Sequence, residues 1–328
     1  MQPSALIRLC RALASLKLTL VALLLFAGGV LYAYWSAQPA AFALAAPLGL
    51  LALNLLAALA SNPAFRQQTP LLVFHLSLLA IVLLVAAGQL TYLKGKLELA
   101  QGEEFAGVLT ETEAGPWHPF RLDKVHFVNH GFDIAYAPGV MRQRTYNRVS
   151  YTDEAGTVRQ AEIGDTTPLV LAGYRFYTTP NKGYAPAFYW HPSGGGAPAL
   201  GTVHLPSYPA NEYRQSQEWQ LPGSGINKMW TQLSFDETII DPERPSEFRL
   251  PKQHKLVLRV GDVRHELQPG QAIDLPGGML VYFGLLTWMG YAVFYDWTIH
   301  WLLAASVTAV LALGWHFWRK FAAKPWDN

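Results

Sequence analysis

The chain has 328 residues, of which 51% are apolar and only 15% are charged. Because an ordinary soluble domain carries about 25% charged residues, this composition excludes a disordered chain and disfavours a cytosolic enzyme. The one cysteine, Cys10, excludes a disulfide scaffold, a cysteine zinc cluster and a CxxC redox motif.

Charge is distributed unevenly along the chain. Of the 23 acidic residues, 22 lie between Lys94 and Asp296, together with 18 of the 25 basic residues. The remainder holds seven basic residues and one acidic residue. This distribution is typical of a membrane protein with one acidic domain outside the bilayer. A net negative domain also predicts that nucleic acid is not a partner.

Three uncharged apolar runs open the chain, at residues 18–35, 41–60 and 70–90, and a fourth covers residues 297–318. Each run has about the 20 residues that a helix needs to cross a hydrocarbon core. The first run is too long for the apolar region of a signal peptide and lacks a convincing cleavage site. We therefore expect four retained transmembrane helices.

The basic residues outside the acidic stretch predict the orientation of these helices. Placing all of them on the cytoplasmic side satisfies the positive-inside rule, with both termini cytoplasmic. These residues are Arg8, Arg11, Lys17, Arg66, Arg319, Lys320 and Lys324. The predicted organisation is an N-terminal segment over 1–92, an exterior (periplasmic) domain over 93–296, and a last helix with a cytoplasmic tail over 297–328.

Residues 277–295 are also uncharged and apolar. As a fifth span, they would place Arg319 and Lys320 on the wrong side of the membrane. The run is rich in aromatic and β-branched residues and is broken by Gly284 and Gly290. It is therefore interpreted as buried strands or as a segment at the membrane interface.

The exterior domain is predicted to consist mostly of β-strands. Residues 120–128 and 255–260 alternate apolar and polar side chains, which is the period of a strand. Gly261-Asp262 and the run 153–156 are turn signals of two hairpins. Residues 181–225 are rich in Pro, Gly, Ser and Asn, which predicts long surface loops. A sandwich or distorted barrel is expected.

Common catalytic signatures are absent from the sequence. It contains no GxSxG, HExxH or Walker A motif, and no CxxCH that could attach a c-type haem to this chain. His126 and His130 are four residues apart, but in a strand that spacing covers about 13 Å. They are interpreted as solvated histidines and not as a metal site.

Histidines inside the apolar runs are the strongest functional candidates. An ionisable residue in hydrocarbon is costly and marks a functional site by default, and neutral imidazole is a standard ligand of haem iron. His75 lies about 7 to 8 Å from the cytoplasmic end of the third run. His316 lies near the same depth in the fourth run, and His300 lies near its outer end. The alternative is that each histidine bonds a neighbouring helix or lies at the lipid headgroups. Asn54 is expected to link helices.

Three features resemble the ResB-type membrane proteins of system II cytochrome c biogenesis. The first is the layout of three spans, a large β-rich exterior domain and a final span. The second is SLKLTLVALLL at the first span together with FHLSLL, which contains His75, in the third. The third is a hairpin that leads to PLVLAGYRFY at residues 168–177.

This resemblance implies a bacterial inner-membrane protein that handles b-type haem, with His75 as the ligand carried over to the iron. Its implied partners are a ResC/CcsA-type membrane protein, apocytochrome c and a thioredoxin-like thiol reductant system. The chain departs from the family where Asp296 is followed by Trp297, in place of an aspartate-proline-glycine motif. It also lacks a tryptophan-rich haem segment, so we expect an accessory subunit without full synthase activity.

Two alternatives stay open. The chain could be a membrane anchor that carries a permanent haem b between quinol and a periplasmic multihaem cytochrome, with His75 and His316 as the candidate pair. It could also be an assembly scaffold without haem, in which case His75 is only a packing residue.

Overall fold

The computed structural model describes residues 10, 12–36, 40–153, 155–210, 214–226 and 228–322, apart from the side chain of Arg66. Arg8, Arg11 and Lys324, on which the predicted orientation partly depends, lie outside the described residues. The chain divides into two compact units. The helical unit contains Met1–Lys94, Thr112–Phe120 and Phe294–Asn328, and the strand unit contains Gly95–Glu111 and Arg121–Val293.

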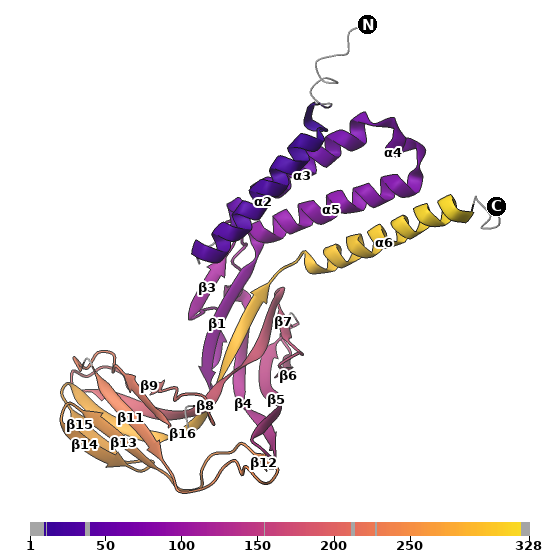
Figure 1. The fold of residues 1–328 in the computed structure, drawn as a ribbon. Helices are drawn as coiled ribbons and strands as arrows, with labels where there is room; N and C mark the ends of the chain where they lie inside the picture. The colour runs from indigo at the N-terminus through magenta and orange to yellow at the C-terminus, as the bar shows by residue number, and fades with distance from the viewer. Residues whose placement is uncertain are drawn as a thin grey trace. The chain divides into compact units, whose positions relative to one another are not determined.

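In the described part of the chain, the helical unit has four long apolar helices and one short helix, α4 (Figure 1). They are α2 (Leu16–Ser36), α3 (Ala41–Ser61), α4 (Pro63–Gln67), α5 (Thr69–Thr91) and α6 (Ile299–Ala322). The long helices have mean hydropathies of 1.4 to 2.6. Their 21 to 24 residues exceed the length that a hydrocarbon core requires. The prediction of four long apolar helices is confirmed, and they indicate a membrane protein.

The fourth long helix begins later than predicted. The apolar run starts at Trp297, whereas α6 starts at Ile299. Asp296 Oδ1 accepts hydrogen bonds from the backbone N–H of Thr298 at 2.8 Å and from its hydroxyl at 2.7 Å. These bonds hold a turn before the helix. The helix then continues past the predicted end at residue 318, because Arg319 and Lys320 favour the last turn of a helix.

Asn54 fastens α3 to the start of α2. Its Oδ1 accepts a hydrogen bond from Thr19 Oγ1 at 2.8 Å, and its Nδ2 donates to the carbonyls of Leu13 at 2.6 Å and Ser15 at 3.0 Å. The prediction that Asn54 links helices is therefore confirmed. An apolar cluster joins α3 to α5 and contains Ala45, Leu48, Ala86 and Leu90.

The large β-rich domain follows α5 and precedes α6 in sequence. Its described strands are β1 (Leu93–Ala100), β2 (Glu104–Ala106), β3 (Glu111–Ala114), β4 (His126–Ala137), β5 (Met141–Thr152), β6 (Val158–Gly164), β7 (Leu169–Leu171), β8 (Tyr174–Pro192), β9 (Ala199–Thr202), β10 (Ser216–Trp219), β11 (Met229–Ser234), β12 (Ser246–Glu247), β13 (Lys255–Val260), β14 (Val263–Leu267), β15 (Ala272–Leu275) and β16 (Gly278–Tyr295). This confirms the prediction of a large β-rich domain.

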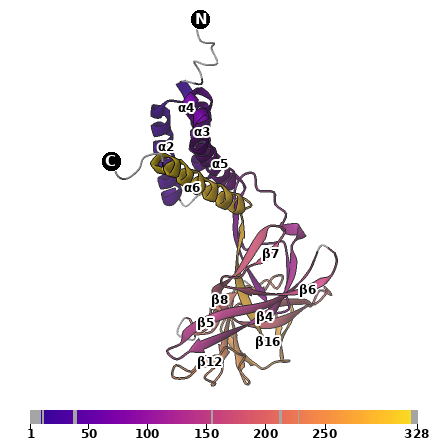
Figure 2. The ribbon, with the colours of Figure 1, turned by 90° about the vertical axis from the view of Figure 1, so that its right-hand side faces the viewer.

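The described strands form three sheets. A seven-stranded sheet has the order β3-β1-β16-β8-β7, with β15 paired to β16 and β9 paired to β8. A four-stranded sheet has the order β10-β11-β13-β14. The third sheet has the order β12-β4-β5-β6, with β2 paired to β4, and several of its strands are visible in Figure 2. Phe127 on β4 makes tilted or edge-on contacts with Phe105 on β2 of the same sheet and with Phe176 on β8 and Tyr291 on β16 of the seven-stranded sheet.

Several local predictions agree with this topology. Gly261-Asp262 joins β13 to β14, whose pairing closes at Val260 and Val263. The turn near residue 153 joins β5 to β6, although Glu154 lies outside the described residues. The ambiguous apolar run is strand β16, so the interpretation as a strand is confirmed and a helical fifth span is excluded for residues 278–295.

Two local predictions were wrong. Residues 120–128 do not form one strand, because a 3-10 turn, η1 (Leu122–Lys124), precedes β4 and Phe120 has a positive φ of 45°. Residues 181–225 are not a continuous loop region, because β8 extends to Pro192 and β9 and β10 follow. Tertiary packing explains the second error. β8 lies between β16 and β7 and has a run of buried side chains from residue 183 to 188 despite its Gly and Pro.

Candidate functional site

His75 lies on α5, six residues after the helix begins at Thr69. At a rise of 1.5 Å per residue, this is about 9 Å along the helix. The ring is half-buried. It packs against Phe65 on α4 with 4.5 Å between ring centroids, and edge-on against Phe74 with 5.2 Å between centroids. The short helix α4 therefore covers one side of the imidazole.

One hydrogen bond shows that Nδ1 of this ring carries a hydrogen. His75 Nδ1 lies 2.8 Å from the carbonyl oxygen of Leu71, one helical turn earlier. Because a carbonyl can only accept, Nδ1 carries the hydrogen and Nε2 of the neutral ring keeps its lone pair. The nearby hydroxyl of Ser77 bonds instead to the carbonyl of Val73 at 2.9 Å. A backbone carbonyl, and not a serine, therefore orients the ring.

This arrangement would allow His75 to hold the iron of a haem. Histidine ligands of metals usually donate the second ring N–H to a carbonyl or carboxylate, which sets the tautomer and the ring orientation. Here Leu71 provides that carbonyl, and Nε2 is the nitrogen that could bind iron. The aromatic neighbour Phe65 adds an apolar wall suited to a macrocycle. His75 alone would supply one ligand to the iron.

His316 lies on α6 beside the beginning of α5. It lines a cavity of about 460 Å³. The other lining residues are Gln67, Gln68, Pro70, Arg319 and Lys320. His75 lies five residues beyond Pro70 on α5, which is about 8 Å along the helix axis. The structure thus places His316 beside the beginning of α5, at the same end of the helical unit as His75, and its role as a second ligand stays a prediction.

His300 lies at the other end of α6. It is exposed and is the second residue of the helix, sixteen residues before His316. That separation is about 24 Å along the helix axis, so a single iron cannot take both His300 and His316 as ligands. Any role of His300 toward haem would require a different iron from one near His75.

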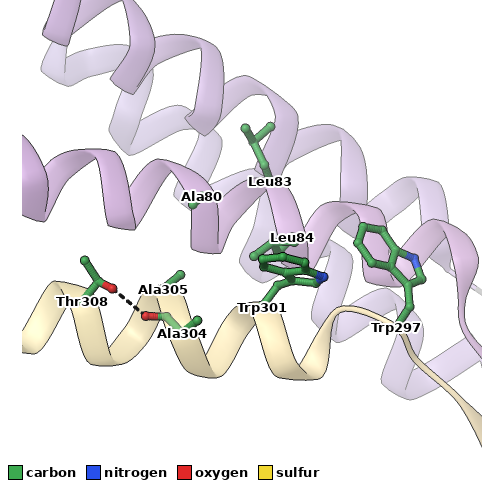
Figure 3. A pocket seen from close by; sticks show the side chains of 8 residues that line it. All are labelled: Ala80, Leu83, Leu84, Trp297, Trp301, Ala304, Ala305 and Thr308. Atoms are coloured by element: carbon green, nitrogen blue, oxygen red, sulfur yellow. Dashed lines mark hydrogen bonds between the residues drawn. The ribbon is translucent and has the colours of Figure 1, made fainter.

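A largely apolar cavity of about 440 Å³ lies between α5 and α6, closer to the His300 end (Figure 3). Its lining residues are Ala80, Leu83, Leu84, Trp297, Trp301, Ala304, Ala305 and Thr308. The hydroxyl of Thr308 donates to the carbonyl of Ala304 at 2.8 Å, so its hydrogen is already used within the helix. This cavity offers packing for an apolar group but no ligand for a metal.

The strand unit contains one polar site that the sequence analysis missed. His204 Nδ1 lies 2.8 Å from Glu98 Oε2, and the imidazole stacks on Trp288 with 4.9 Å between centroids and 2° between planes. These residues, together with Asn181 and Ser207 among others, line a cavity of about 580 Å³. Glu98 and His204 are 106 positions apart, and no sequence motif could have indicated the pair.

The remaining candidates carry no metal chemistry in the described residues. His126 and His130 are both exposed on β4, where His126 contacts Glu104 at 3.1 Å and His130 contacts Ser150 at 2.7 Å. No group of three or more His, Cys, Asp or Glu side chains within the described ranges is placed to hold a metal ion. Their interpretation as solvated histidines agrees with their exposure.

The fold is that of a membrane protein in which a β-rich domain is inserted, in sequence order, between the third and fourth long apolar helices. Residues 64–207 match the ResB-like family, and this match confirms the resemblance inferred from the sequence. It includes His75 and the whole of α5, and extends through β9 into the strand unit. At the level of the family, the match supports a subunit related to cytochrome c biogenesis. None of the curated proteins compared matches the chain.

Proposed function

We propose that this protein is a ResB-like subunit of a system II cytochrome c biogenesis complex, and that it holds a b-type haem in the membrane through His75. The haem would be passed to apocytochrome c with the help of a ResC/CcsA-type partner. The observation that carries this proposal is the bond of His75 Nδ1 to the Leu71 carbonyl, which would leave Nε2 of the ring to bind iron.

The protein's own residues would bind and orient the haem. His75 would supply one nitrogen ligand, Leu71 would hold the imidazole in its tautomer, and Phe65 would pack beside it. The bound haem would supply the iron and the vinyl groups that the maturation reaction requires. With Cys10 as its single cysteine and no CxxCH motif, this chain provides no thiol pair for the attachment. It is therefore proposed to be an accessory subunit of a holocytochrome c synthase.

The cellular arrangement is part of the same proposal. The acidic residues lie almost entirely between Lys94 and Asp296, and the basic residues outside that stretch would lie on the cytoplasmic side of a bacterial inner membrane. The strand unit would then be periplasmic, where it could contact the partner or apocytochrome c. A thioredoxin-like system would keep the thiols of apocytochrome c reduced.

Complementation in cells tests this function. Cells that lack the chain are expected to lose covalently bound c-type haem and to retain their other b-type cytochromes. The wild-type gene should restore maturation, and a His75→Ala gene should restore little of it. Full maturation by His75→Ala, at wild-type protein level, would contradict the role of His75.

The second candidate function is a haem b anchor for electron transfer between quinol and a periplasmic multihaem cytochrome. Its support is the position of His316 near the same end of the helical unit as His75. A His316→Ala substitution separates the two functions. If His316 is the second ligand, the isolated His316→Ala protein loses the low-spin bis-histidine spectrum. If a partner supplies that ligand, the spectrum of the isolated protein does not change. If neither the wild-type protein nor the variants contain haem, the haem-free scaffold is the function that remains.

A further inference from the structure

Residues Thr112–Phe120 contain the end of strand β3 and the segment after it, and they belong to the helical unit. The N–H of Trp117 donates to the carbonyl of Leu90 at 2.8 Å, and the N–H of Gly115 donates to the carbonyl of Tyr92 at 2.9 Å. His118 Nδ1 lies 2.8 Å from the carbonyl of Thr91. The segment thereby satisfies carbonyls that the helix terminus leaves without partners.

Close packing fixes this segment to the helix end. Gly115 lies directly against the main chain of Leu90, where an added Cβ would collide. His118 is buried and makes edge-on contacts with Phe120 and Tyr295, each with 4.8 Å between ring centroids. Burial lowers the pKa of His118, while its bond to the Thr91 carbonyl acts in the opposite direction.

The outer surface of this segment is apolar. Gly115 and His118 are buried, whereas the other residues of this stretch are exposed: Pro116, Trp117, Pro119 and Phe120. Trp117 is 64% exposed and Phe120 is 61% exposed. No charged residue lies between Gly115 and Phe120. A contiguous group of exposed rings of this kind marks an interaction surface.

Two further tryptophans lie at the same end of the helical unit. Trp297 Nε1 donates to the hydroxyl of Thr91 at 3.0 Å, which places this indole beside the last residue of α5. Trp301 follows one turn later on α6, and both rings border the cavity between α5 and α6 (Figure 3). Trp297 is 44% exposed and Trp301 is 63% exposed.

We infer that residues 115–120 form an anchor that inserts Trp117 and Phe120 into the headgroup region of the lipid bilayer. The lipid headgroup region is identified as the partner of this surface by the position of residues 115–120 at the end of α5. α5 has 23 residues, or about 34 Å, and so spans a hydrocarbon core of about 30 Å from end to end. Its last turn then lies at the membrane interface, and Trp117 is hydrogen-bonded to that turn. Tryptophan is enriched at this depth because its ring is apolar and its N–H is polar.

Depth-dependent quenching in lipid nanodiscs tests the anchor with the full-length chain. In a Cys10→Ser background, a fluorophore is attached at Trp117→Cys, at Phe120→Cys or at Val158→Cys. Val158 is a matched control, because it is 71% exposed on β6 of the strand unit. Phe120→Cys leaves Trp117 in place, so one failed variant does not end the test.

The labels at 117 and 120 are expected to emit at shorter wavelength than the label at 158, and to be quenched most by lipids with a nitroxide near the headgroup. A nitroxide near the end of the acyl chain should quench them less. Equal quenching at all three positions by every lipid overturns the anchor. The anchor is also overturned if a water-soluble quencher reaches the labels at 117 and 120 in nanodiscs and is excluded only when a ResC-type partner is added. The surface would then be a protein interface.

Discussion

The buried lysine of the strand unit makes stability depend on pH in a direction that can be worked out. Lys182 on β8 is 2% exposed, and its Nζ donates to the carbonyl of Thr179 at 3.0 Å. The pKa of Lys182 is lowered from 10.5 to about 8, mainly by burial and also by the neighbouring charge of Arg142, while Asp165 acts in the opposite direction. Removing this charge is therefore expected to stabilise the protein near neutral pH.

The magnitude follows from the two pKa values. Between about pH 8 and 10.5 the unfolded chain binds more protons at Lys182 than the folded chain, so the free energy of unfolding rises with pH through this window. Below about pH 8 the buried charge lowers the free energy of unfolding by its full amount, about 3 kcal/mol. Lys182→Met removes it but leaves the Thr179 carbonyl without its donor, which costs about 1 kcal/mol. The expected net gain is about 2 kcal/mol near pH 7, with a small loss above pH 10.

Denaturation of the full chain in detergent, followed by tryptophan fluorescence across this pH range, measures the effect. Lys255→Met is the matched control, because the Lys255 side chain is 63% exposed and lies 3.7 Å from Glu266. The control should change the free energy of unfolding little and without a trend in pH. A Lys182→Met protein that is less stable than wild type at pH 7, by an amount independent of pH, would refute the reasoning.

Three further predictions concern the helical unit and its orientation. Gly115→Ala is expected to detach residues 112–120 from Leu90 and lower the thermal midpoint, and an unchanged midpoint would mean that the backbone adjusts without loss. Asn54→Ala removes three hydrogen bonds and should destabilise the helical unit by about 1 to 3 kcal/mol in a detergent denaturation series; no change would show that water or lipid replaces them. Alkaline phosphatase should be active when fused at Gly195 and inactive after Asn328, and the reverse pattern would invert the proposed orientation.

The sequence predicted the long helices because an uncharged run of about 20 residues has few other stable structures. The harder case was the run that became β16, whose composition is as apolar as that of a span. Its aromatic and β-branched residues and the positions of Gly284 and Gly290 favoured a strand, and charge balance across the membrane excluded a fifth helix. Local composition and a global constraint together made this prediction correct.

Composition misled the analysis of residues 181–225. Gly183 and Pro186 are typical of loops, yet both lie within β8. Pairing with β16, from a distant part of the sequence, stabilises the strand there, together with the neighbouring strand β9. The same limit applies to Glu98 and His204, which only the folded sheet brings to 2.8 Å. Contacts between residues that are far apart in sequence leave no periodic signal.

The site itself was predictable in part. The position of His75 within an apolar run identified it, and its bond to the Leu71 carbonyl is a contact between adjacent helical turns. The cover provided by Phe65 depends on how α4 turns back to α5, which the sequence analysis did not foresee. The attachment of residues 112–120 to the helical unit was also missed, because they were assigned to the exterior domain by their charge and position alone.

The most direct test of the central proposal is the haem-to-protein ratio of His75→Ala, measured by absorption spectroscopy on the protein purified with its ResC-type partner. His130→Ala is the matched control, because His130 is exposed on β4 and bonds only to Ser150 among the described residues. His75→Ala is expected to lose haem and His130→Ala to keep it, and added imidazole should restore part of the haem content of His75→Ala by replacing the missing ligand. A His75→Ala protein with the wild-type haem content and spectrum would contradict the proposal that His75 binds haem iron.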